Sequence, residues 1–180
     1  MADINFKTDD DAGDRPKSPA RPPVVSPLSL EDHPEVVFIE LLYFAYRDFI
    51  SDPDAALLTL GFGRAHHRVI HFVNRHPGIR VADLLDILKI TKQSLGRVLK
   101  QLVDTGYIDQ RTGPVDRRQR LLYPTEAGRR LAMRLRDPQV KRIAAALAAL
   151  TPAERKGAES FLRNMVNAAD RDQVARIVDQ

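Results

Sequence analysis

Residues 90–106 have the sequence ITKQSLGRVLKQLVDTG, which carries a clear helical pattern. Apolar side chains recur every three or four residues, as they do on one face of an amphipathic helix. These apolar positions are Leu95, Val98, Leu99, Leu102 and Val103. Thr91 can cap the first turn, and Gly106 can take the left-handed conformation that often follows a last turn. The pattern predicts a short helix with defined ends.

The opposite face of this predicted helix is polar and basic. It carries Lys92, Gln93, Gly96, Arg97 and Lys100. Its cations and amide can contact DNA phosphates and base edges. A solvated surface helix of any globular protein can carry the same charges, so this segment alone leaves both interpretations open. The neighbouring segments decide between them.

Composition indicates one globular domain with a basic region. The chain has 180 residues, 43% of them hydrophobic, and a formal net charge of +4. Residues 80–120 hold nine Lys and Arg against five Asp, an excess of four that equals the excess of the whole chain. Cations concentrated in this way are typical of a nucleic-acid-binding surface.

The absence of cysteine excludes disulfides, thiolate metal sites, cysteine-ligated iron–sulfur clusters and thiol redox sensing. The N-terminus, MADINFKTDD, has no apolar signal core, and no run of about 18 apolar residues follows. We therefore expect a cytoplasmic protein without membrane insertion. No cofactor is expected either, because no Gly-rich phosphate loop, nucleophile elbow or paired carboxylates stand in a suitable context, and an enzyme is not predicted.

The part of the chain before the basic region has two sections. Residues 1–33 are rich in proline and acidic residues, which predicts a disordered arm, with a Pro-rich docking segment as the alternative. Within residues 34–58, a helix of about four turns is predicted from Pro34, and it is apolar on almost every side. A break is expected after it, at residues 51–54 (SDPD). Such a helix needs cover on more than one face, which a second subunit can supply.

Residues 59–125 follow the order of a winged helix-turn-helix. Helices are predicted at residues 63–75 and 81–88, and a three-residue turn then leads into the helix at 90–106. Alternating residues at 107–111 and 119–123 predict two antiparallel strands, joined by the tip TGPVDRR. The hairpin is the wing. This combination makes DNA binding the favoured function of the basic helix.

The C-terminal region, residues 126–180, is predicted to be helical and to take part in dimerisation. Thr125 can cap a helix that reaches about Leu150, with a bend or break at Pro138. Thr151 and Glu154 form a capping box for the next helix. The apolar face of that helix comprises Ala158, Phe161, Leu162, Met165 and Val166. The fold class is thus mainly α, of α+β type, with long dimerisation helices at both ends.

Residues 58–131 resemble the MarR-type transcriptional regulators. The resemblance rests on HPGIRVADLLDIL, then ITKQSLGRVLKQLVDTGYI, then Asp116 and Arg118 as the Asp-x-Arg of the wing, and finally Pro-Thr-Glu-Ala-Gly. It implies a homodimer that presents two winged helix-turn-helix lobes to a palindromic operator in double-stranded DNA. It also implies a repressor that a small-molecule effector releases.

Carried over by position, the resemblance assigns roles to individual residues. The major-groove contacts would be Lys92, Gln93, Ser94 and Arg97. Arg118 would enter the minor groove, positioned by Asp116, and Lys100 and Arg117 complete the DNA-binding set. Gly96 departs from the family, which usually has a side chain there. An effector pocket would lie between the dimerisation helices and the DNA-binding lobe. Its lining would be Tyr43, Phe44, His66, His67 and Ile70.

Two alternatives stay open at this stage. A winged helix can serve protein assembly or DNA architecture without reading bases, although the clustered cations argue against this function. His67 and His71 stand at i, i+4 and could share a metal such as Zn²⁺, which would make the protein a metal-responsive regulator. No thiolate or nearby carboxylate completes that ligand set, so no metal site is predicted.

Overall fold

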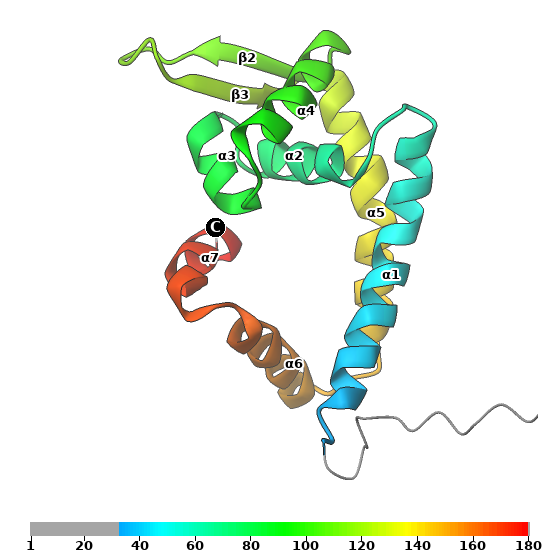
Figure 1. Ribbon diagram of the computed structural model, residues 1–180. Coiled ribbons are helices and arrows are strands. Elements are labelled where there is room, and N and C mark those ends of the chain that lie inside the picture. The colour runs from blue at the N-terminus through cyan, green and yellow to red at the C-terminus, as the bar shows by residue number, and fades with distance from the viewer. Residues whose placement is uncertain (1–32, 180) are drawn as a thin grey trace, which may run out of the picture. The chain divides into compact units, whose positions relative to one another are not determined.

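The computed structural model describes residues 33–179, and the predicted N-terminal arm lies outside the described residues apart from His33. Contacts divide the chain into two compact units, residues 1–40 and residues 41–180. The second unit holds helices, a three-stranded antiparallel sheet and the element order of a winged helix-turn-helix (Figure 1). The predicted fold class is confirmed.

Helix α1 (Val36–Leu58) runs without interruption through Pro53, so the predicted break at residues 51–54 is wrong. Proline has no N–H to donate to the carbonyl of Phe49, four residues earlier. The Gln139 side-chain amide donates to that carbonyl instead, at 3.4 Å. Pro53 itself is buried, which adds apolar contact. The break is avoided because a distant residue replaces the missing donor.

The lobe that the sequence predicts to bind DNA, hereafter the DNA-binding lobe, comprises α2 (Arg64–Arg75), α3 (Val81–Leu88) and α4 (Lys92–Asp104), followed by strands β2 (Ile108–Thr112) and β3 (Arg120–Pro124). These elements lie close to their predicted positions. The short strand β1 (Ile79–Arg80) was not predicted, and it pairs with β3 through Ile79 opposite Leu122. The sheet order is β1-β3-β2, so β3 is the central strand.

One apolar core joins these elements. Helix α4 contributes four of its five predicted apolar positions as buried residues, and the fifth, Val103, is half-buried. Helix α2 contributes Val69, Ile70 and Val73, and the central strand contributes Leu122. Buried side chains of this kind each stabilise the fold by about 1.5–3 kcal/mol. The core therefore fixes which face of α4 is left to solvent.

Helix α5 (Glu126–Ala148) continues through Pro138, so a break at this proline is also wrong. Both halves of the helix are held by side chains. Leu131 and Leu135 lie in the core before the proline. Beyond it, Arg142 forms an ion pair with Asp52 of α1 at 3.6 Å. The helix therefore has tertiary contacts on both sides of the proline, which removes one hydrogen bond.

The chain ends in α6 (Pro152–Met165), the 3₁₀ turn η1 (Ala168–Asp170) and α7 (Arg171–Val178). The capping box of α6 is confirmed, because Glu154 N donates to Thr151 Oγ1 and Thr151 N donates to Glu154 Oε2. Its predicted apolar face is solvent-exposed, with Leu162 58% exposed and Met165 52%. The turn η1 and helix α7 form the C-terminal segment, which has two polar contacts with the DNA-binding lobe. Lys89 forms an ion pair with Asp170 at 3.1 Å, and Arg75 donates a hydrogen bond to the Val178 carbonyl at 3.3 Å.

Candidate nucleic-acid interface

The start of α4 is fixed by the turn that precedes it. Lys89 takes a left-handed conformation, with φ of 51°, and is the only residue besides glycine to do so between residues 33 and 179. Thr91 then caps the helix by accepting a hydrogen bond from Ser94 N at 3.2 Å. Gly106, with φ of 76°, turns the chain after the helix as predicted. The exposed face of α4 is therefore held by caps at both ends and by the core beneath.

Five polar side chains of α4 lie on this exposed face: Lys92, Gln93, Ser94, Arg97 and Lys100. Lys92, Gln93 and Arg97 form no side-chain hydrogen bond or ion pair with any residue from 33 to 179. Lys100 pairs with Asp104 one turn on. An exposed pair at i, i+4 contributes only about 0.3–0.5 kcal/mol. A phosphate can therefore compete for the Lys100 ammonium group at small cost.

The tip of the wing is closed by its own hydrogen bonds. Gly113 N donates to the Gln119 carbonyl at 3.0 Å, and Gln119 N donates to the Asp116 carbonyl at 3.0 Å. The Asp116 carboxylate accepts from the backbone N–H of Arg118 at 2.9 Å. The carboxylate thus holds the backbone at Arg118 and leaves the guanidinium group to project. Arg117 and Arg118 have exposed side chains.

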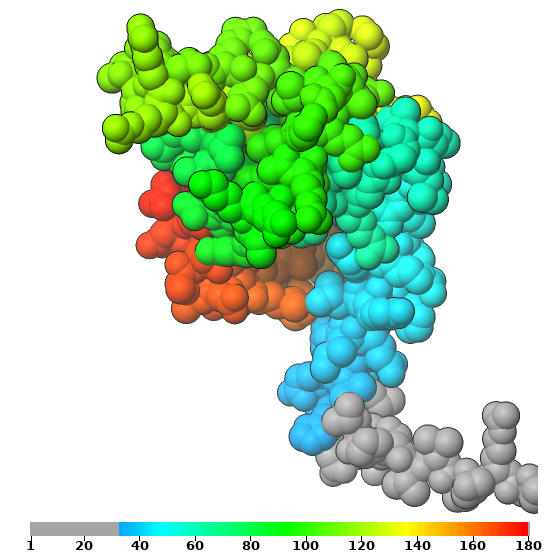
Figure 2. Space-filling model, turned by 45° about the horizontal axis from the view of Figure 1, so that its top comes forward, coloured from blue at the N-terminus to red at the C-terminus, as the bar shows by residue number. Residues whose placement is uncertain are grey.

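Arg111 and Arg120, on the strands of the wing, differ from the arginines of the tip because their side chains have partners. Arg111 pairs with Asp109 at 2.7 Å, and its guanidinium group lies 4.7 Å from the centre of the Tyr123 ring. Arg120 donates to the Thr112 hydroxyl across the hairpin at 2.7 Å. Arg111 and Arg120 thus have partners on the wing strands, whereas the tip residues Arg117 and Arg118 have no side-chain partner within residues 33–179. In Figure 2 the green surface of α4 and the yellow-green wing both face the viewer.

His66, which the sequence placed in an effector pocket, instead connects α2 to α4. Its Nδ1 accepts from Gly63 N at 3.1 Å, so its Nε2 carries the proton and donates to the Gln101 side-chain oxygen at 2.8 Å. Its ring stacks on Phe62 with centroids 4.7 Å apart. The histidine therefore links α2 to one flank of α4, where Gln101 lies one turn after Arg97. Sequence patterning missed this role because Gln101 belongs to another helix.

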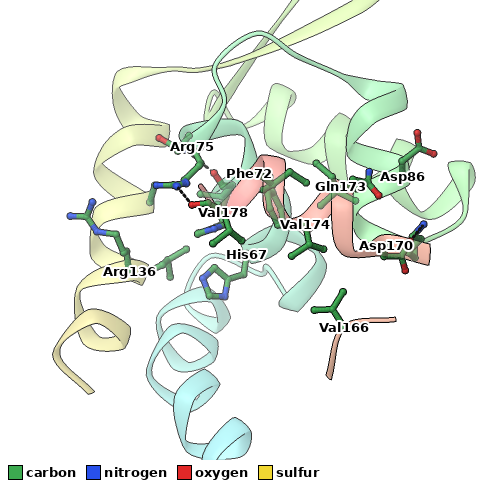
Figure 3. A pocket seen from close by; sticks show the side chains of 18 of the residues that line it. His67, Phe72, Arg75, Asp86, Arg136, Val166, Asp170, Gln173, Val174 and Val178 are labelled. Carbon is green, nitrogen blue, oxygen red and sulfur yellow. Dashed lines mark hydrogen bonds and ion pairs between the residues drawn. The ribbon is translucent and has the colours of Figure 1, made fainter. Parts of the chain in front are cut away.

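A cavity of about 1150 Å³ lies beside the DNA-binding lobe, between α2, α3, α5 and the C-terminal segment (Figure 3). Of the five predicted pocket residues, His67 and Ile70 line it. Tyr43 and Phe44 do not, and they are 67% and 48% exposed on α1. Further lining residues include His71, Arg75, Met133, Arg136, Val174 and Ile177. The wall is thus mixed, because apolar side chains stand beside cations and the acids Asp86, Glu126 and Asp170 also line the cavity.

His67 and His71 lie together on this wall. Burial lowers the pKa of His67, the charge of His71 lowers it further, and Asp54 opposes the shift. Burial likewise lowers the pKa of His71, together with the charges of Arg75 and His76. Both imidazoles are therefore more readily neutral than free histidine. No group of three or more His, Asp or Glu gathers in a metal-binding arrangement within residues 33–179.

Within residues 33–179, no helix is long and apolar enough to cross a membrane.

The fold and its exposed basic face define a winged helix-turn-helix protein. The MarR family model matches residues 60–119. The HTH-type transcriptional regulator PetP of Rhodobacter capsulatus is 43% identical over 141 residues, which cover 78% of this chain and 85% of that protein. The chain belongs to the MarR family of transcriptional regulators.

Two solved structures illustrate the shared fold. A mutant MarR from E. coli, complexed with operator DNA, has 20% sequence identity and a TM-score of 0.58, covering 79% of this chain and 100% of that chain. The PcaV transcriptional regulator from Streptomyces coelicolor, in complex with its natural ligand, has 21% identity and a TM-score of 0.58, covering 80% of this chain and 99% of that chain. At these identities the likeness concerns the fold.

Proposed function

We propose that the protein is a dimeric, sequence-specific DNA-binding repressor that a small-molecule effector releases from a palindromic operator. The observation that carries the proposal is a set of cations that have no side-chain partner within residues 33–179. These are Lys92 and Arg97 on α4 and Arg117 and Arg118 at the wing tip. Groups left without partners in the fold are available to an anionic ligand. The clustering of these groups on a winged helix favours duplex DNA.

The dimer is proposed from apolar surface that the single chain leaves uncovered. Leu41 is 60% exposed on α1, and Leu162 is 58% exposed on α6. Large apolar patches of this kind are rare on monomers and mark interfaces. We assign dimerisation to residues 34–58 and 126–180, and DNA binding to residues 59–125. Two lobes related by a two-fold axis would then meet two half-sites of a palindrome.

The two DNA-reading elements have separate tasks in this proposal. The major-groove contacts are Lys92, Gln93, Ser94 and Arg97, where Arg97 can form a paired hydrogen bond with guanine. Arg118, at the wing tip, enters the adjacent minor groove and responds to its width and potential. Asp116 shapes the backbone that carries it. Lys100 and Arg117 contact phosphates, which position the lobe without reading sequence.

The cavity beside the lobe is the proposed effector site. Its wall includes α2, which carries the His66 contact to α4, and the C-terminal segment attached to Lys89 and Arg75. A ligand that binds one arrangement of these elements more tightly shifts the population toward it. An effector there is therefore well placed to alter the orientation of α4.

Three alanine variants test the DNA-reading roles when their affinities are measured on operator variants at several salt concentrations. Arg97→Ala should lose about 1–3 kcal/mol per half-site and relax preference at one symmetric base position. Arg118→Ala should weaken binding to most sequences and flatten the preference for narrow A·T-rich grooves. Lys100→Ala should reduce the salt slope by about one per subunit and keep the ranking of operators. Equal affinity of the wild type for palindromes and random duplex would reject the proposal.

A further inference from the structure

Gly96 stands in the second turn of α4, where the fold itself gives no reason for a glycine. It is exposed, and it does not have the positive φ of Gly61, Gly78 or Gly106. A Cβ atom built at Gly96 would meet nothing within 4 Å. By contrast, a Cβ atom at Gly128 would lie 2.0 Å from the Tyr107 carbonyl oxygen. Neither backbone conformation nor packing within the described chain requires glycine at position 96.

Glycine at this position has a cost. In a helix interior it lowers the equilibrium constant for helix formation about fivefold relative to alanine, because it loses more backbone freedom on ordering. Within the described residues, one other helical glycine is equally unexplained by its neighbours, Gly157. It lies in α6, which we assign to the dimer interface. An intermolecular contact can therefore account for both positions.

The surroundings of Gly96 indicate the partner. Residues three and four positions away lie beside it on the helix surface. Three of these four residues are the polar Lys92, Gln93 and Lys100, while the fourth, Leu99, is buried in the core. Arg97 follows Gly96 directly in the sequence. The helix surface at Gly96 is therefore recessed relative to the long polar side chains around it. If those side chains contact DNA, the bare backbone at Gly96 approaches the floor of the major groove.

We propose that Gly96 is a specificity-determining position that accommodates the 5-methyl group of a thymine. The space left by the missing Cβ has the size of one methyl group. Thymine is the base that presents a methyl group in the major groove of unmodified DNA. The inference rests on the proposed operator binding, and it assigns to position 96 a contact that no side chain makes.

The test removes a methyl group from the DNA and adds one to the protein. Operator duplexes selected by the wild type are made with each thymine of the half-site replaced symmetrically by deoxyuracil, and affinities are measured by fluorescence anisotropy for wild type and Gly96→Ala. The wild type should lose about fourfold per half-site at one thymine, the value of one buried methyl group. Gly96→Ala should bind the thymine operator at least tenfold more weakly and recover most of that loss on deoxyuracil at the same position.

Thermal unfolding supplies the control for folding, because Gly96→Ala should unfold at a temperature no lower than wild type. The inference is overturned if Gly96→Ala binds the thymine operator as tightly as wild type. It is also overturned if no single deoxyuracil position restores the affinity of the variant. A wild type that prefers no duplex would instead reject the proposed function, so the two failures are distinguishable.

Discussion

Replacing Gly128 by alanine should damage the junction between the wing and α5. The added Cβ atom would lie 2.0 Å from the Tyr107 carbonyl oxygen and 3.1 Å from its carbonyl carbon. That oxygen already accepts from Thr125 N at 3.2 Å. The Thr125 hydroxyl also donates to the Gly106 carbonyl at 2.6 Å and caps Gly128 N at 3.0 Å. The alanine must therefore separate backbone segments that several hydrogen bonds hold together.

The expected loss follows from these contacts. Overpacking a tight site costs about 1–3 kcal/mol, and weakening the bond from Thr125 N to the Tyr107 carbonyl adds about 1 kcal/mol. The better helix propensity of alanine returns less than about 1 kcal/mol. We expect the free energy of unfolding to fall by about 2–3 kcal/mol relative to wild type. Affinity for DNA should fall as well, because β2 starts at this junction.

Urea unfolding followed by circular dichroism, at one fixed protein concentration, measures this loss. Gly96→Ala is the matched control, because it makes the same chemical change on an open helix surface. It should raise the free energy of unfolding by about 1 kcal/mol. A loss below about 0.5 kcal/mol for Gly128→Ala would refute the steric argument, which requires more than the ordinary cost of a surface substitution.

Three further predictions concern other parts of the chain. Burial lowers the pKa of His67 and His71 in the folded chain, so the unfolded chain takes up protons first as pH falls below about 6.5, and the free energy of unfolding should decrease there. A variant with glutamine at both positions should show a flatter profile of unfolding free energy between pH 7.5 and 5.5. Parallel profiles for this variant and wild type would contradict the prediction. Gln139→Ala should lower the free energy of unfolding by about 1 kcal/mol, because Phe49 loses its donor; an unchanged urea midpoint would count against that role. Truncation after Leu150 should abolish the dimer in sedimentation equilibrium, and a soluble dimer with full DNA binding would show that α6 and α7 are dispensable.

The winged helix-turn-helix was predictable because its signals are local. The spacing of Leu95, Leu99 and Leu102 identified the buried face of α4, and these residues are buried in the structure. Thr91 and Gly106 marked the ends of the helix by side-chain and backbone chemistry that acts within a turn. Local patterns of this kind need no knowledge of tertiary contacts.

The differences arise where a distant residue decides the outcome. Pro53 suggested a break, and the Gln139 side chain supplies a substitute donor to the carbonyl that proline leaves unbonded. The strand β1 has two residues, too few for an alternating pattern, and exists through its pairing with β3. His66 has the helical position of a pocket residue, yet its hydrogen bond to Gln101 directs it to α4. None of these contacts has a signal in the neighbouring sequence.

Selection of binding sites from a pool of random duplexes gives the sharpest test of the proposed regulator. The purified full-length protein is incubated with the pool, bound duplexes are recovered over several rounds, and the enriched sequences are compared. We predict enrichment of a palindrome whose half-site centres lie about one helical turn apart, bound by two subunits. Recovery of duplexes with no shared sequence, or of a site bound by one subunit, would contradict the proposal of a dimeric, sequence-specific regulator.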